Sequence, residues 1–100
     1  MASVVTSLVH DVPLRDGELS AMRLALSEAR AAGEAGEVPV GAVVLLDGVV
    51  RASARNRMRT DGDPTAHAET IVLRDAAALL GVPLLREATL VVSMERPRRA

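Results

Sequence analysis

The stretch Val38–Leu46, VPVGAVVLL, is followed directly by Asp47-Gly48 and then by a more mixed stretch, Val49–Asn56. A short, nearly continuous run of apolar residues that is rich in valine is typical of a strand buried on both faces. An Asp-Gly pair between two such stretches is a strong signal for a two-residue hairpin turn. The sequence therefore predicts a buried strand over Val38–Leu46 that turns back into an edge strand over Val49–Asn56.

A helix is predicted on the N-terminal side of this hairpin, over Leu19–Ala32. Its apolar residues recur at helical spacing, and glycines follow directly after it. The predicted inner face consists of Met22, Ala25, Leu26 and Ala29. The residues before it, 1–16, show no clean period and are predicted to form a flexible leader.

A second helix and a third strand are predicted on the C-terminal side. The helix spans about Thr65–Leu80, and Gly81 stands where a helix-ending glycine belongs. Ala88–Met94 is again an apolar run. The element order is therefore helix, strand, strand, helix, strand, and such a strand–helix–strand crossover usually places the last strand parallel to an earlier one.

Length and composition narrow the class of protein. One hundred residues allow one domain, and 49% apolar with 25% charged residues is a globular balance. The absence of cysteine excludes a disulfide framework, a cysteine nucleophile and a thiolate metal site built from this chain alone. The absence of aromatic residues excludes a ring-type base-stacking platform. No apolar run is long enough to span a bilayer, so we expect a cytoplasmic protein without membrane contact.

His67 and Glu69 are the residues best placed for chemistry. Both fall at the start of the second predicted helix, where free backbone N–H groups and the positive end of the helix dipole lie. A neutral imidazole there can ligate a metal, and a carboxylate two residues on can move a proton of a metal-bound water. A bare His-x-Glu is nevertheless a weak motif, because the helix dipole alone favours glutamate at this position.

Several further blocks surround this pair in a fixed order. They are Glu37-Val38-Pro39-Val40-Gly41-Ala42-Val43-Val44, Asp47-Gly48, Asn56-Arg57, Asp63-Pro64-Thr65-Ala66-His67-Ala68-Glu69, Leu73-Arg74 and Ala88-Thr89-Leu90-Val91-Val92-Ser93-Met94-Glu95. Over about Ala21–Glu95 the chain resembles the bacterial tRNA-specific adenosine deaminases of the cytidine deaminase-like superfamily.

This resemblance implies an α/β fold of three layers, in which a mixed sheet lies between helices. His67 would be the zinc ligand and Glu69 the proton shuttle. Asn56 would contact the flipped nucleoside, and Val40, Gly41 and Ala42 would form a wall of the pocket. The implied reaction is conversion of adenosine to inosine at the wobble position of tRNA, by a homodimer with one zinc per subunit.

The chain departs from this family at its C-terminal end. The family continues with Glu-Pro-Cys-x-x-Cys, whereas Glu95 is followed in this chain by Arg96-Pro97-Arg98-Arg99-Ala100. We therefore expect a partial deaminase domain over 17–95, lacking the C-terminal helices and strands of the fold, and a tail over 96–100 unrelated to the family.

Both zinc-ligand cysteines are missing, and one protein ligand cannot hold a zinc ion. The spacing of Asp61, Asp63, Glu95 and His10 does not offer replacements. We expect neither tight zinc binding nor deamination from this chain alone.

Three interpretations remain open from the sequence. The chain is the N-terminal portion of a tRNA deaminase, a non-catalytic fragment or binding remnant, or a relative that acts on a free base or nucleoside. A stretch of basic residues also has two interpretations, since it could contact tRNA phosphates or simply face solvent along an edge strand. Its members are Arg51, Arg55, Arg57 and Arg59.

Overall fold

The computed structural model describes residues 3–6 and 16–95. Within these residues the elements follow in the order β1 (Ser3–Thr6), α1 (Asp16–Glu34), β2 (Val40–Leu46), β3 (Val49–Arg55), α2 (Met58–Asp61), α3 (Ala68–Leu80), α4 (Val82–Leu85) and β4 (Thr89–Met94).

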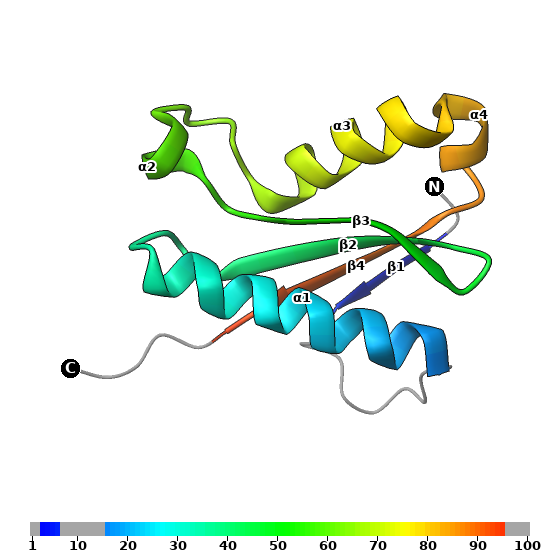
Figure 1. The fold of residues 1–100 in the computed structure, drawn as a ribbon, viewed down its shortest axis with the longest axis horizontal. Coiled ribbons are helices and arrows are strands. Elements are labelled where there is room, and N and C mark those ends of the chain that lie inside the picture. The colour runs from blue at the N-terminus through cyan, green and yellow to red at the C-terminus, as the bar shows by residue number, and fades with distance from the viewer. Residues whose placement is uncertain (1–2, 7–15, 96–100) are drawn as a thin grey trace.

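One sheet with the strand order β1-β4-β2-β3 forms the middle layer. β2 is antiparallel to both β3 and β4, so these two run in the same direction, and β1 is parallel to β4. α1 covers one face of the sheet and α3 the other (Figure 1). This confirms the predicted three-layer α/β architecture and the parallel return of the last strand.

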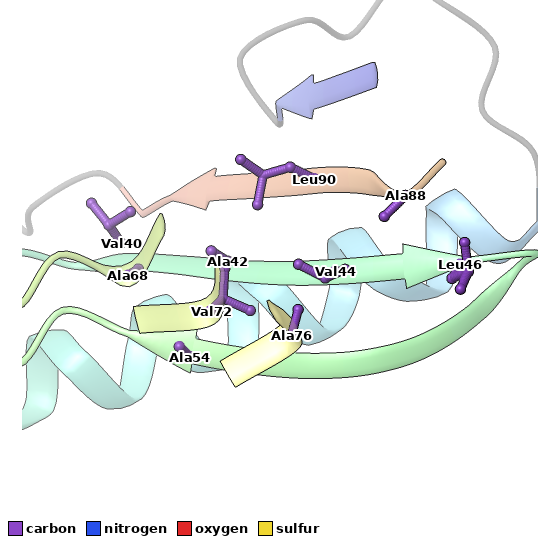
Figure 2. Close-up of a cluster of buried hydrophobic side chains, with 10 residues drawn as sticks. All are labelled: Val40, Ala42, Val44, Leu46, Ala54, Ala68, Val72, Ala76, Ala88 and Leu90. Carbon is purple, nitrogen blue, oxygen red and sulfur yellow. The ribbon is translucent and has the colours of Figure 1, made fainter. Parts of the chain in front are cut away.

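The central strand β2 is buried along its whole length. Alternate side chains, from Val40 to Leu46, pack with Ala68, Val72 and Ala76 of α3 (Figure 2). The intervening residues Val43 and Leu45 pack on the other face, against α1. The sequence of β2 is continuously apolar because helices cover both of its faces.

The hairpin between β2 and β3 is confirmed. Asp47 and Gly48 have φ values of 53° and 76°, as a tight turn with two left-handed residues requires. β2 ends directly before this pair and β3 begins directly after it.

Two segments predicted to lack secondary structure each contain a short element. Within the predicted leader, Ser3–Thr6 forms β1, which pairs with Thr89–Val92 and so flanks the outer side of β4. A four-residue strand is too short to carry a visible period, and its pairing is decided by tertiary contacts. The predicted loop after β3 contains the short helix α2. The remaining leader residues 1–2 and 7–15, like the tail over 96–100, lie outside the described residues.

The buried face of α1 consists of alanines rather than of the predicted mixture. Ala21, Ala25, Ala29 and Ala32 are fully buried, whereas Met22 and Leu26 are only half-buried at the margins of this face. The reason lies in β2, at Gly41. A Cβ atom added there would overlap the carbonyl oxygen of Ala25 and lie 2.8 Å from the backbone nitrogen of Ala29. The helix therefore rests almost directly on the backbone of the strand.

Within the described parts of the chain, no helix combines the length and the apolar character needed to cross a membrane.

The contact at Gly41 predicts a large effect of one methyl group. Gly41→Ala should lower the free energy of unfolding by about 1–3 kcal/mol or more, because α1 must move away from the sheet to admit the side chain. Urea denaturation measures the change. Gly33→Ala is the matched control, since its added Cβ would lie 3.3 Å from the Pro39 side chain, a contact that a small shift relieves. Equal effects of the two substitutions would contradict the close packing at Gly41.

Candidate functional site

The start of α3 brings together the two residues that the sequence singles out for chemistry. His67 occupies the position before the helix, in an extended conformation with φ −80° and ψ 148°, and its carbonyl oxygen accepts a hydrogen bond from Ile71 N–H at 2.9 Å. Glu69 lies in the first turn, where the helix dipole favours a carboxylate. His67 is exposed and Glu69 half-buried, so both side chains can be reached from solvent.

The Asn56 side chain fixes this helix end to the sheet. Asn56 follows β3 and is only 4% exposed. Its Oδ1 accepts a hydrogen bond from the backbone N–H of Ala68 at 2.8 Å, and its Nδ2 donates to the carbonyl oxygen of Val38 at 3.1 Å. The Asn56 amide therefore supplies the capping hydrogen bond that the His67 side chain does not make.

This geometry assigns Asn56 a structural role that the sequence does not reveal. The resemblance implies that Asn56 contacts a nucleoside, and that role stays a prediction. The Asn56 amide, which follows β3, bonds both Val38 and Ala68 and so joins the strand entry to the helix start. Such a bridge to positions 18 and 12 residues away leaves no local sequence signal.

The expected pocket wall is divided between the two faces of the sheet. Val40 and Ala42 belong to the cluster on the α3 side, together with Ala68 and Val72 (Figure 2). Gly41 faces α1 instead, where its lack of a side chain admits the helix. The structure therefore brings Val40 and Ala42, but not Gly41, to the side of the sheet that carries His67.

The loop between Asn56 and Ala68 is closed at its base and held at its tip. At the base, Arg57 N–H donates to the carbonyl oxygen of Ala66 at 2.9 Å. At the tip, the carboxylate of Glu37 accepts hydrogen bonds from Arg59 N–H at 3.0 Å and from Thr60 N–H and Oγ1 at 2.7 and 2.8 Å. Glu37 is 6% exposed. Sequence reasoning gives this residue no role.

The turn that leads into His67 is built by Asp63. Its Oδ1 accepts hydrogen bonds from Thr65 N–H at 2.8 Å and Thr65 Oγ1 at 2.7 Å. These bonds hold the pKa of Asp63 below its ordinary value. The sequence predicts that the helix begins at about Thr65, whereas α3 begins at Ala68. The turn explains this difference, because it occupies the residues before His67. The sequence Asp-Pro-Thr is the local signal that could have shown this turn.

The basic stretch is partly engaged within the loop. Arg57 makes a bidentate contact with Asp61, with Nη2 to Oδ1 at 3.0 Å, and Asp61 raises the pKa of Arg57. Arg59 donates from Nη1 to the carbonyl oxygen of Gly36 at 3.2 Å. Arg51 is exposed and Arg55 half-buried on β3. Two of the four arginines therefore help to shape the loop.

The donor groups that the structure describes do not make a complete zinc site. Zinc sites use at least three protein ligands from Cys, His, Asp or Glu. The chain has no cysteine, and among residues 3–6 and 16–95 no three such side chains gather so as to hold a metal ion. Asp61 pairs with Arg57, Asp63 with Thr65, and Glu95 with Arg30 at 3.4 Å. His10 lies outside the described residues.

Replacement of Asn56 tests the anchor of this site. Asn56→Ala should lower the free energy of unfolding by about 1–3 kcal/mol, because it leaves the buried Ala68 N–H without its acceptor and removes the link to the Val38 carbonyl. Thermal or urea denaturation measures the loss. Ser53→Ala, on the exposed side of β3, is the control and should change stability by less than about 0.5 kcal/mol. Equal stability of the two variants would show that the amide bridge does not form.

The Glu37 contacts predict a defined dependence on pH. The hydrogen bond from Arg59 N–H, followed by those from Thr60, holds the pKa of Glu37 below its ordinary value of 4.5. Because the folded state favours the charged form, these bonds stabilise the protein fully above pH 4.5 and lose their effect as the pH falls through the lower, folded pKa.

Urea titrations between pH 7 and pH 3 test this dependence. The stability difference between the parent chain and Glu37→Gln should be largest at neutral pH and shrink in acid. A difference that stays constant over this range would contradict the assignment. The pKa of Asp63 is also lowered, so its hydrogen bonds too stabilise the protein less in acid. Both chains contain Asp63, so its contribution cancels in the difference between them.

Comparison with known proteins places this geometry in a family. The cytidine and deoxycytidylate deaminase zinc-binding region matches residues 16–96. A tRNA-specific adenosine deaminase of Agrobacterium fabrum is 54% identical over 74 residues, which are 74% of this chain and 49% of that protein. A tRNA(Ile)-lysidine synthase of Deinococcus radiodurans is 54% identical over 77 residues, 76% of this chain and 13% of the synthase.

A solved structure agrees with these relatives. It comes from a study of A-to-I editing by tRNA:A34 deaminases at the wobble position of transfer RNA, and it superimposes with a TM-score of 0.70 at 53% identity. The match covers 74% of this chain and 57% of the solved one. The chain thus spans about half the length of the Agrobacterium fabrum deaminase and of the solved chain. With the family match over residues 16–96, the chain belongs to the cytidine and deoxycytidylate deaminase zinc-binding family.

Proposed function

We propose that this chain carries the His-x-Glu part of a tRNA adenosine deaminase site. In this proposal His67 is a zinc ligand and Glu69 the residue that moves protons during hydrolysis. The observation that supports it best is the anchored start of α3, where Asn56 holds the segment that presents both residues to solvent. The identity to tRNA-specific adenosine deaminases over the same segment supports the choice of tRNA as substrate.

The chemistry of the reaction explains why a carboxylate is needed at Glu69. In hydrolytic deamination of adenosine, water adds to C6 of the base, ammonia leaves and inosine remains. A proton must pass from the water to the ring nitrogen, and another to the departing amine. A half-buried carboxylate at the edge of the site can accept and return these protons.

The proposal assigns this chain one part of the site. His67 offers one donor where zinc needs three from the protein, so no step through a metal follows from the described residues alone. The missing donors would come from polypeptide that corresponds to the remaining half of the relatives. tRNA is the proposed partner. The homodimer that the resemblance implies and the cytoplasmic location expected from the sequence remain predictions.

Metal analysis of the purified chain tests the incomplete donor set. After equilibration with zinc and removal of the excess, plasma mass spectrometry should find far less than one zinc per chain. An anticodon stem-loop with adenosine at the wobble position should yield no inosine. Stoichiometric zinc would contradict this prediction, because it would require ligands that the described residues do not assemble.

A chimera tests the roles of His67 and Glu69 directly. Residues 1–95 joined to the part of the Agrobacterium fabrum deaminase beyond its matched segment should bind zinc and form inosine. His67→Ala should abolish zinc binding. Glu69→Gln should retain zinc and slow inosine formation by about 10²–10⁴-fold, the usual contribution of a general acid–base residue.

The outcomes separate the alternative functions. Adenosine and guanine, offered as free substrates beside the stem-loop, distinguish a tRNA deaminase from an enzyme of nucleosides or bases. Zinc binding that survives His67→Ala would overturn the assignment of the ligand. A chimera that folds and holds zinc but deaminates none of these substrates would favour a binding remnant.

A further inference from the structure

We propose that Glu37 is a positioning residue, whose carboxylate clamps the helix α2 so that the loop between Asn56 and Ala68 holds His67 at one place relative to the sheet. The inference rests on the proposed function, in which His67 and Glu69 are the groups that must be held. It adds a residue that touches neither of them and acts through the loop.

The loop tip has no apolar anchor of its own. α2 spans only Met58–Asp61 and contains no buried residue. Arg57, at the position before it, makes no side-chain capping hydrogen bond. The Glu37 carboxylate caps α2 instead, because it accepts hydrogen bonds from the N–H groups of Arg59 and Thr60 and from the hydroxyl of Thr60. Polar contacts therefore hold the tip in place.

Glu37 is itself fixed to the rest of the fold. Its backbone N–H donates to the carbonyl oxygen of Ala32, in the last turn of α1, at 2.9 Å. The next residue, Val38, accepts the Asn56 side-chain amide. Two neighbouring residues at the entry of β2 therefore hold the tip and the base of the same loop.

The clamp reaches His67 through a continuous path of hydrogen bonds. Asp63 N–H donates to the carbonyl oxygen of Met58 in α2, at 3.0 Å. The Asp63 carboxylate holds Thr65, and the Thr65 carbonyl oxygen accepts the N–H of His67 at 2.8 Å. Release of the tip removes the support at one end of this path, while the Asn56 bond at the other end persists.

Hydrogen exchange followed by NMR tests the clamp on the intact chain. In Glu37→Ala, the amides of Arg59, Thr60 and His67 should exchange at least about tenfold faster, the change expected from losing one hydrogen bond to a charged group. The ring-proton signals of His67 should shift. The ratio between the exchange rates of the β2 amides and those of the amides in the middle of α1 should be the same in Glu37→Ala as in the parent chain.

Two variants separate positioning from a general loss of stability. Glu37→Gln keeps an acceptor oxygen and should restore part of the protection. Glu34→Ala removes an exposed carboxylate three residues earlier and should change none of these signals. If Arg59 and Thr60 are released while the His67 signals stay in place, the positioning role is wrong. If the amides of Arg59, Thr60 and His67 accelerate by no more than those of β2 and α1, Glu37 contributes only to global stability and the proposal also fails.

These readouts need neither zinc nor tRNA. A negative result therefore counts against the clamp and leaves the roles of His67 and Glu69 standing. A chimera without deaminase activity would count against the proposed function and leave the clamp standing.

Discussion

The buried amide of Asn56 is the contact on which the site depends. One side chain joins the carbonyl oxygen of Val38, at the entry of the central strand, to the Ala68 N–H, at the start of α3. A first-turn N–H has no partner within its own helix, and this bond supplies one directly from the end of β3. This bridge, together with the packing of Val72 and Ala76 on the sheet, places the start of α3 and with it His67 and Glu69.

On the opposite face of the sheet, small side chains determine how closely α1 packs. The chain has no aromatic residue, and its core is built from valine, leucine and alanine. Gly41 and the buried alanines of α1 allow strand and helix to approach until their backbones touch. α1 and α3 therefore differ in how they meet the sheet. α1 is fixed by close packing, and α3 by packing together with hydrogen bonds at its first turn.

Patterns within a few residues predicted most of the architecture. The apolar run of β2, the Asp-Gly turn and the helical spacing before and after them indicated the order of the main elements, and the family resemblance implied the three layers. β1 was not predicted, because four residues are too few to show an alternating pattern and its partner β4 lies near the other end of the chain. His67 and Glu69 were singled out by their place at a helix start, and the surrounding family blocks gave that weak motif its weight; their roles stay predictions. The contacts of Glu37 and Asn56 were not predicted, because a buried polar side chain is explained only by partners that the fold brings to it.

We infer that the hydrogen bonds of this chain alone organise the site, before any metal or RNA binds. A scalar coupling across the hydrogen bond, between Ala68 N and the side-chain carbonyl carbon of Asn56, tests it most directly by NMR on the metal-free chain. We predict a measurable coupling and a slowly exchanging Ala68 amide. Absence of the coupling, together with exchange as fast as in an unstructured peptide, would contradict the account.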